Sequence, residues 1–129
     1  MAKRRVRKPT DAELVILNVL WTSGPSTVRE VNQVLNETRP TGYTTTLKQM
    51  QVMTAKGLLL RDESCRPQVY RPALAQQQTQ RQLVKDLMEG AFGGSARSLV
   101  LQALQTRDVS REELARIEKL LDQLEGDRT

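Results

Sequence analysis

A cluster of polar side chains near the middle of the sequence has the residue types that read DNA. Thr44, Thr45, Lys48 and Gln49 fall in a segment that we predict to form a helix from about residue 44 to residue 56. At about 100° per residue, they lie on or near the side opposite the apolar residues of that helix. Threonine and lysine can contact base edges or phosphates, and glutamine can bridge adenine. We therefore predict that these four side chains contact DNA, with an ordinary solvated helix face as the alternative.

Three arginines that follow this helix are candidate phosphate contacts. Two short strands are predicted at residues 58–61 and 68–71, and the polar turn between them makes the pair a hairpin. Arg61 and Arg71 belong to the strands, whereas Arg66 lies near the tip of the hairpin. We expect these arginines to touch phosphates more than bases.

Positive charge is concentrated in the first part of the chain. Residues 1–72 hold twelve basic and six acidic side chains, a net charge of +6, whereas residues 73–129 hold eight and nine, a net charge of −1. A basic N-terminal arm, residues 1–9, contains Arg4 and Arg5, which could neutralise phosphates or enter a minor groove. A disordered, solubilising tail is the alternative for this arm.

The residues needed for most catalytic and metal-binding chemistry are missing from the sequence. It has no histidine and one cysteine, Cys65, so one chain can assemble neither a histidine-activated nucleophile nor a thiolate zinc site. No glycine-rich phosphate-binding loop occurs. We therefore predict no catalytic residue, no metal and no cofactor. Few aromatic side chains are available to stack on RNA bases, so double-stranded DNA is the expected partner.

Helix-start signals and the hairpin place the candidate DNA contacts in a winged helix-turn-helix. Thr10 with Glu13, and Thr27 with Glu30, have the spacing of capping boxes, so we predict that a helix begins at each pair. The third helix would end at Gly57, which can take a left-handed conformation. Three helices followed by a hairpin is the element order of a winged helix-turn-helix domain, which we assign to residues 10–73. The expected fold class is mainly α with a small β-hairpin.

Residues 74–129 are predicted to form a helical dimerisation region. Apolar residues recur there at helical spacing in three predicted helices. Helices of this length are marginal alone in water, so their apolar faces must pack on something. We expect a second copy of the chain, with packing on the same chain as the alternative. The candidate interface residues are Leu99, Leu114, Ile117, Leu121 and Leu124.

Nothing in the sequence indicates a membrane segment. No apolar run approaches the roughly 20 residues that span a bilayer. The basic N-terminus is not followed by the apolar stretch of a signal peptide. We therefore expect a cytoplasmic protein without membrane insertion.

Several stretches of the sequence together match a known pattern. They are DAELVILNVLW (11–21), TVREV (27–31), GYTTTL (42–47), KGLL (56–59), VYRP (69–72), and FGGS (92–95) with SLV (98–100). With these stretches the chain resembles the BlaI/MecI/CopY family of penicillinase repressors. The resemblance covers about residues 8–125 and implies a winged-helix homodimer that binds a palindromic operator and represses transcription. In the antibiotic-resistance branch it also implies a membrane sensor metalloprotease as a partner and cleavage in the C-terminal part of the repressor.

The sequence departs from the pattern of this family at three places. Val52 stands where the family usually has arginine, on the helix face assigned to DNA. The possible cleavage region falls at Gln102 and Ala103, where the penicillinase branch has Asn-Phe. The cysteine-rich metal motif that ends the copper branch is absent, which excludes copper sensing through that motif. The alternative function is a winged-helix adaptor that binds proteins without reading a DNA sequence, because a fold alone does not fix function.

Overall fold

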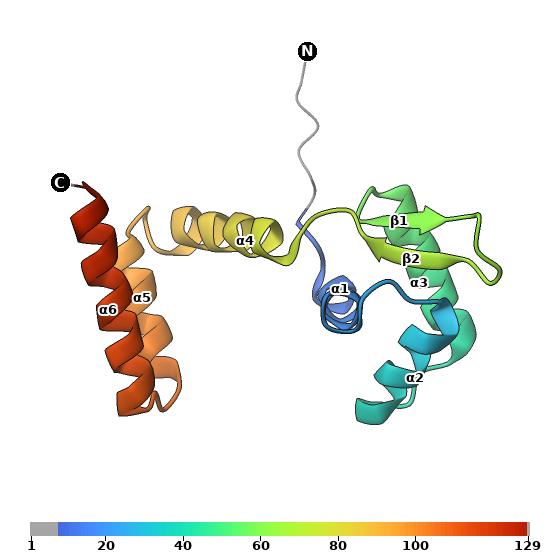
Figure 1. Cartoon of the computed structure of the whole chain (residues 1–129), viewed down its shortest axis with the longest axis horizontal. Coiled ribbons are helices and arrows are strands. Elements are labelled where there is room, and N and C mark those ends of the chain that lie inside the picture. Colours follow the sequence, from blue (N-terminus) through green and yellow to red (C-terminus); the bar gives the residue numbers. More distant parts are fainter. Residues whose placement is uncertain (1–7, 129) are drawn as a thin grey trace, which may run out of the picture. The chain divides into compact units, whose positions relative to one another are not determined.

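The chain divides into two compact units, one ending at Leu83 and the other beginning at Val84 (Figure 1). The computed structural model describes residues 8–128. The first unit contains three helices, a two-stranded hairpin and the start of a fourth helix, and the second unit contains the remaining helical residues. The elements are α1 (Asp11–Ser23), α2 (Val28–Thr38), α3 (Tyr43–Ala55), β1 (Leu59–Asp62), β2 (Val69–Pro72), α4 (Gln76–Ala91), α5 (Ala96–Thr106) and α6 (Arg111–Arg128).

The two predicted capping boxes both start helices. The hydroxyl of Thr10 accepts from the backbone N–H of Glu13 at 3.2 Å, and the Glu13 carboxylate accepts from the backbone N–H of Thr10 at 2.9 Å. Thr27 and Glu30 repeat the pair at the start of α2 with the same two distances. These bonds satisfy backbone donors that the first turn of a helix leaves without a partner. The sequence therefore sets where α1 and α2 begin.

The end of α3 explains why the hairpin starts one residue later than predicted. Gly57 has φ +85°, and its N–H donates to the carbonyl of Thr54 at 3.1 Å. The N–H of Leu58 donates to the carbonyl of Met53 at 2.9 Å, which completes a Schellman motif. Because the N–H of Leu58 closes the helix, the strand begins at Leu59 instead of Leu58.

The two strands pair antiparallel, with Leu60 opposite Arg71 and Arg61 opposite Tyr70. The segment between α1 and α2 adds to the edge of β2, because the N–H of Ser26 donates to the carbonyl of Tyr70 at 3.0 Å and the reverse bond is 2.8 Å. Three helices closed by a hairpin, with the first interhelix segment paired to it, form the predicted winged helix-turn-helix.

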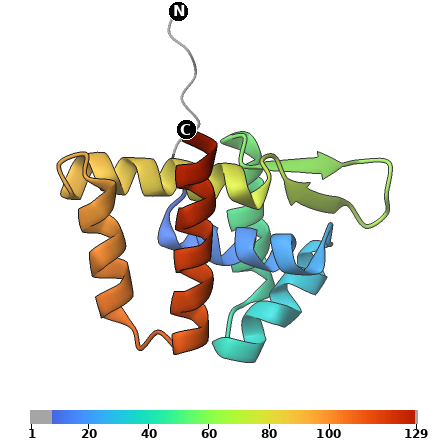
Figure 2. The same cartoon turned by 60° about the vertical axis from the view of Figure 1, so that its left-hand side comes forward.

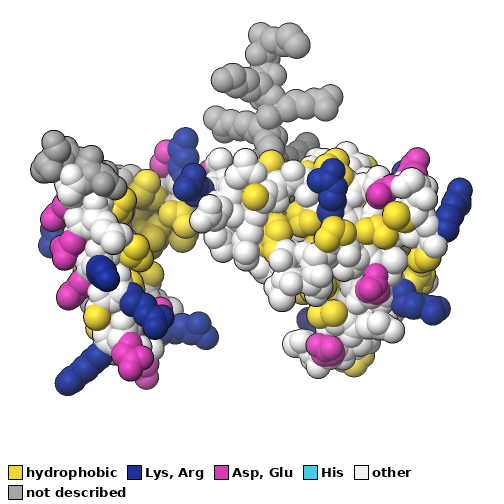
Figure 3. Space-filling view, viewed as in Figure 1, with side chains coloured by type: hydrophobic (Ala, Val, Ile, Leu, Met, Phe, Trp, Pro, Cys, Tyr) yellow, Lys and Arg dark blue, Asp and Glu magenta, His cyan; other side chains and the backbone are white. Residues whose placement is uncertain are grey.

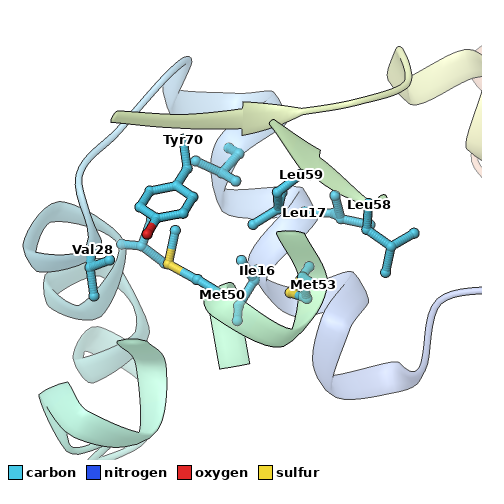
Figure 4. Close-up of a cluster of buried hydrophobic side chains, with 10 residues drawn as sticks. Ile16, Leu17, Val28, Met50, Met53, Leu58, Leu59 and Tyr70 are labelled. Atoms are coloured by element: carbon cyan, nitrogen blue, oxygen red, sulfur yellow. The ribbon is translucent and has the colours of Figure 1, made fainter. Parts of the chain in front are cut away.

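The core of the first unit lies between α1, α2, α3 and the hairpin. Figure 4 shows Met50 of α3 beside the ring of Tyr70 of β2, in one cluster with Ile16 and Leu17 of α1. Each fully buried side chain of this size contributes roughly 1.5–3 kcal/mol relative to an exposed one. The buried apolar residues are Ile16, Leu17, Leu20, Val28, Val31, Met50, Met53, Leu58, Leu59 and Tyr70.

The second unit is built from helices that bury little of themselves. Figure 2 shows α5 and α6 running antiparallel, joined by a short loop. The hydroxyl of Ser95 accepts from the N–H of Ser98, and that of Ser110 accepts from the N–H of Glu113, both at 3.1 Å. Of the residues from Val84 to Gly126, none is buried. Within the described part of the chain, no helix has the length and apolar character needed to cross a membrane.

Candidate nucleic-acid interface

The solvent-facing side of α3 presents Thr44, Lys48 and Gln51. Thr46, Met50 and Met53 lie on the opposite side of the helix and are almost completely buried. The apolar side predicted from the sequence is therefore the one that anchors the helix. Fixing α3 by three buried side chains leaves its polar side free to enter a groove of DNA.

Two of the predicted DNA contacts, Thr45 and Gln49, lie at the margin of this face. Gln49 is half-buried, and both residues line an apolar groove of about 580 Å³ between α1 and α2, beside Val15 and Val19. Gln51, which the helical-wheel argument did not single out, occupies the exposed side instead. Because of the way α3 is oriented in the core, Thr44 and Gln51 lie on its exposed face, whereas Gln49 is half-buried.

Val52 lies on the exposed side of α3, with 43% of its surface accessible. An exposed valine beside Lys48 cannot form an ion pair with a phosphate. Val52 therefore gives this part of the face an apolar surface. Such a surface could contact the methyl group of thymine.

The hairpin, which we call the wing (residues 59–72), projects its arginines to different extents. Arg66 is exposed at the turn, and Arg71 is exposed on β2. Arg61 forms a 2.7 Å ion pair with Glu63 on the same hairpin. Among the three predicted arginines, Arg61 is therefore the one held by an ion pair on the wing itself, whereas Arg66 and Arg71 are exposed.

The wing turn is ordered by its own acidic residue. Oδ1 of Asp62 accepts from the N–H of Ser64 at 2.9 Å and from the Ser64 hydroxyl at 2.6 Å, and Oδ2 accepts from the Cys65 thiol at 3.7 Å. The Ser64 hydroxyl and N–H lower the pKa of Asp62 because they bind its ionised form. Cys65 is half-buried in this turn.

The structure brings two residues to the interface that the sequence argument missed. Arg29 in the first turn of α2 and Tyr43 at the start of α3 line a groove of about 530 Å³, together with Arg66 and Gln68 of the wing. Tyr43 is 49% exposed. The sequence signal that could have identified Arg29 is a basic side chain two residues after the capping Thr27, in the first turn of α2. An arginine in such a position can contact a phosphate.

Figure 3 shows Lys and Arg side chains projecting at the end of the first unit where the wing lies. The other predicted contacts, Arg4 and Arg5, fall outside the described residues. Within residues 8–128, no group of three or more His, Cys, Asp or Glu side chains could hold a metal ion. The first unit therefore offers a polar and basic surface formed by α3, the start of α2 and the wing.

The five predicted dimer residues lie on α5 and α6 with large parts of their side chains uncovered. Leu99 and Ile117 are half-buried, whereas Leu114, Leu121 and Leu124 are exposed, the last by 59%. Apolar side chains also gather elsewhere on this unit, as the space-filling view shows (Figure 3). Further exposed apolar residues of the unit are Val84, Leu87, Val100, Leu101 and Leu120.

The possible cleavage region lies inside a helix. Gln102 and Ala103 are exposed in the middle of α5. The hydroxyl of Thr106 donates to the carbonyl of Gln102 at 2.6 Å. A protease that cut here would first have to unwind this part of α5, because a helical backbone does not fit an extended substrate cleft.

Comparisons with known proteins agree with the sequence resemblance. A profile of the penicillinase repressor family matches residues 9–123, which is nearly the whole chain. The transcriptional regulator BlaI of two Mycobacterium tuberculosis strains, CDC 1551 / Oshkosh and H37Rv, is 28% identical over 117 residues. This alignment covers 90% of the chain and 84% of each relative. The matched proteins are regulators of transcription and not enzymes.

Proposed function

The chain belongs to the penicillinase repressor family of transcriptional regulators, and we propose that it represses transcription as a homodimer on a palindromic DNA operator. In this proposal α3 enters the major groove and Thr44, Thr45, Lys48 and Gln49 contact the DNA. Arg66 and Arg71 of the wing bind phosphates, and Arg61 does so after exchanging its ion pair with Glu63. The basic arm with Arg4 and Arg5 adds further phosphate contacts.

The observation that carries the DNA-binding part is the two-sided character of α3. Its buried side is fixed in the core by Thr46, Met50 and Met53, while Thr44 and Lys48 face solvent beside an arginine-bearing wing. A rigid helix with polar side chains near its N-terminus fits the width of a major groove, and the neighbouring arginines fit the flanking phosphates.

The dimer part is supported by the uncovered apolar side chains of the second unit. Leu114, Leu121 and Leu124 are exposed on one helix, and no residue from Val84 to Gly126 is buried. Helices this short gain most of their stability from packing. A second copy of the same unit would cover these side chains, and Leu99 and Ile117 would complete the interface. Two joined DNA-binding units then bind two half-sites far more tightly than one.

Release from the operator is the third part of the proposal. Separation of the two subunits would lower DNA affinity because it removes the joint binding of two half-sites. Cutting near Gln102 and Ala103 by a membrane sensor metalloprotease would produce this separation, since it divides α5 and detaches α6. The cut requires local unwinding of α5, so a signal that loosens the second unit would speed it.

The decisive experiment is selection of binding sites from random duplex DNA at physiological salt, followed by a salt titration on the enriched sequence. We expect an inverted repeat with half-sites about one helical turn apart, bound at least about a thousandfold more tightly than random DNA. Binding that depends on salt but shows no sequence preference would reject the operator proposal. In that case, nonspecific DNA binding through the basic arm or the winged-helix adaptor function would replace the operator proposal.

A further inference from the structure

We propose that two asparagines of α2, Asn32 and Asn36, act as positioning residues for DNA recognition by fixing the N-terminus of α3. The inference rests on the proposed function, because it concerns how α3 is presented to DNA. Neither asparagine is among the side chains assigned to contact DNA. Their side-chain amides instead bind the turn that joins α2 to α3.

The contact with the turn is made to both backbone groups of one residue. The N–H of Thr41 donates to Oδ1 of Asn36 at 2.9 Å, and Nδ2 of Asn36 donates to the carbonyl of Thr41 at 2.9 Å. Nδ2 of Asn32 donates to the same carbonyl at 3.0 Å. Thr41 immediately precedes Gly42, the N-cap residue of α3. The asparagines therefore hold the chain at the point where it enters the helix.

A second contact reaches into α3 itself. Nδ2 of Asn32 also donates to the hydroxyl of Thr46 at 2.9 Å, and the Thr46 side chain is almost completely buried. The second hydrogen of Asn36 Nδ2 is shared between the carbonyl of Asn32, at 2.8 Å, and Oδ1 of Asn32, at 3.2 Å. Asn32, Asn36, Thr41 and Thr46 form one network, which we call the turn clamp.

The turn clamp replaces a cap that the sequence of α3 does not provide. Gly42 stands at the N-cap position and has no side chain, so no side-chain cap bond is made there. Helices α1 and α2, in contrast, begin at threonines with complete capping boxes. An uncapped helix start frays readily, because its first N–H groups have no partners within the helix. The clamp fixes this start from the neighbouring helix.

The helix start that the clamp fixes is also the part proposed to read DNA. Thr44 and Thr45 lie between Thr41 and Thr46, which are the two residues held by the clamp. Base-edge hydrogen bonds require donors and acceptors to be held within a few tenths of an ångström. Contacts to phosphates tolerate more movement, because they depend mainly on charge. Loss of the clamp should therefore reduce sequence discrimination more than overall DNA affinity.

The test uses the full chain with Asn36→Ala, and Gln33→Ala as the matched control on an exposed position of α2. Alanine favours helix formation more than asparagine does, so α2 itself should not be weakened. Hydrogen exchange of the free protein is measured first. We expect the Thr41 amide to exchange about tenfold faster in Asn36→Ala, with the amides of Met50 and Met53 unchanged. If the Thr41 amide exchanged at the same rate in Asn36→Ala as in the unchanged protein, the turn clamp would be contradicted.

Affinities for the selected operator and for a length-matched random duplex are then compared at equal salt. We expect the ratio of the two to fall about tenfold in Asn36→Ala and not in Gln33→Ala. In a background of Thr44→Ala with Thr45→Ala, Asn36→Ala should lower the ratio by less than about twofold, because the residues through which it acts are gone. If Asn36→Ala lowered the affinities for the operator and for the random duplex by the same factor, Asn36 would have only a structural role, and the proposal would be overturned.

The two measurements also separate this inference from the proposed function. Faster exchange at Thr41 with an unchanged affinity ratio would leave the operator intact and reject the positioning role. If the selection enriches no sequence, the operator proposal fails and the positioning role fails with it, while exchange still reports on the clamp.

Discussion

Glu13 in the first turn of α1 forms a 2.9 Å ion pair with Lys56 at the end of α3. Its other carboxylate oxygen accepts from the backbone N–H of Thr10, so one side chain both caps α1 and joins it to α3. Burial alone raises the pKa of Glu13, but the Thr10 N–H and Lys56 outweigh it, and the pKa lies below its usual value of 4.5. The ionised form of Glu13 therefore stabilises the folded protein.

The stability of the first unit should fall in acid partly because of Glu13. The pKa of Glu13 in the folded protein lies below its ordinary value of 4.5. Ionised Glu13 therefore stabilises the folded protein fully above that ordinary value, and this stabilisation is lost as the pH falls through the pKa of the folded protein. Glu13→Gln should lower the free energy of unfolding near neutral pH by about 1 kcal/mol, because it weakens the cap and removes the ion pair. Urea unfolding between about pH 6 and pH 3 should then depend less on pH than in the unchanged protein.

Glu37→Gln is the control for this prediction, because Glu37 is an exposed carboxylate on α2. It should leave both the stability and its pH dependence close to those of the unchanged protein. An equally steep loss of stability in acid with and without Glu13 would contradict the assignment.

Lys48 and Arg66 should contribute to DNA affinity without supporting the fold. Both side chains are exposed, so Lys48→Ala and Arg66→Ala should change the melting temperature little. The logarithm of DNA affinity falls as the logarithm of salt concentration rises. If each side chain contacts one phosphate per subunit, each substitution should make this slope less steep by about 2 in a dimer. Fluorescence anisotropy at several salt concentrations measures this slope. Lys85→Ala on α4 is the control, and an equal slope in all variants would remove the site assignment.

Arg29 should bind DNA although it lies outside both α3 and the wing. It lines the groove shared by Tyr43 and Arg66, next to the N-terminus of α2. Arg29→Ala should weaken binding to the selected operator about fivefold to tenfold, and binding to random DNA by a similar factor, because a phosphate contact carries no sequence information. The same titration with Arg81→Ala, an exposed arginine of α4, serves as the control. A loss confined to the operator would make Arg29 a base contact instead.

The winged fold could be predicted from the sequence because local signals fix where its elements begin and end. The Thr-x-x-Glu pairs at Thr10 and Thr27 and the glycine at Gly57 act within one turn of chain, so no knowledge of packing is needed. The one-residue shift of the hairpin depends on the bond between Leu58 and Met53, which spans the end of the helix. Such a bond is hard to foresee from residue types alone.

The candidate interface could be predicted only in part, because it depends on tertiary packing. A helical wheel separates Lys48 from Met50, but the choice between Gln49 and Gln51 rests on how far α3 rotates against α1 and α2. Arg29 joins the interface only because the start of α2 lies beside the wing. Contacts between elements distant in sequence leave no periodic signal, and these were the ones missed.

We expect the second unit to hold the proposed homodimer together through the apolar side of α6. Ile117→Asp with Leu121→Asp places two charges among side chains that a partner would bury, and an unpaired buried charge costs several kcal/mol. We expect monomers by light scattering, operator affinity reduced by at least about a hundredfold, and an unchanged core in the first unit. Ala115→Asp with Lys119→Asp adds the same side chains on the opposite side of α6 and should remain dimeric. A dimer that persists with charges at Ile117 and Leu121 would place the interface on other helices.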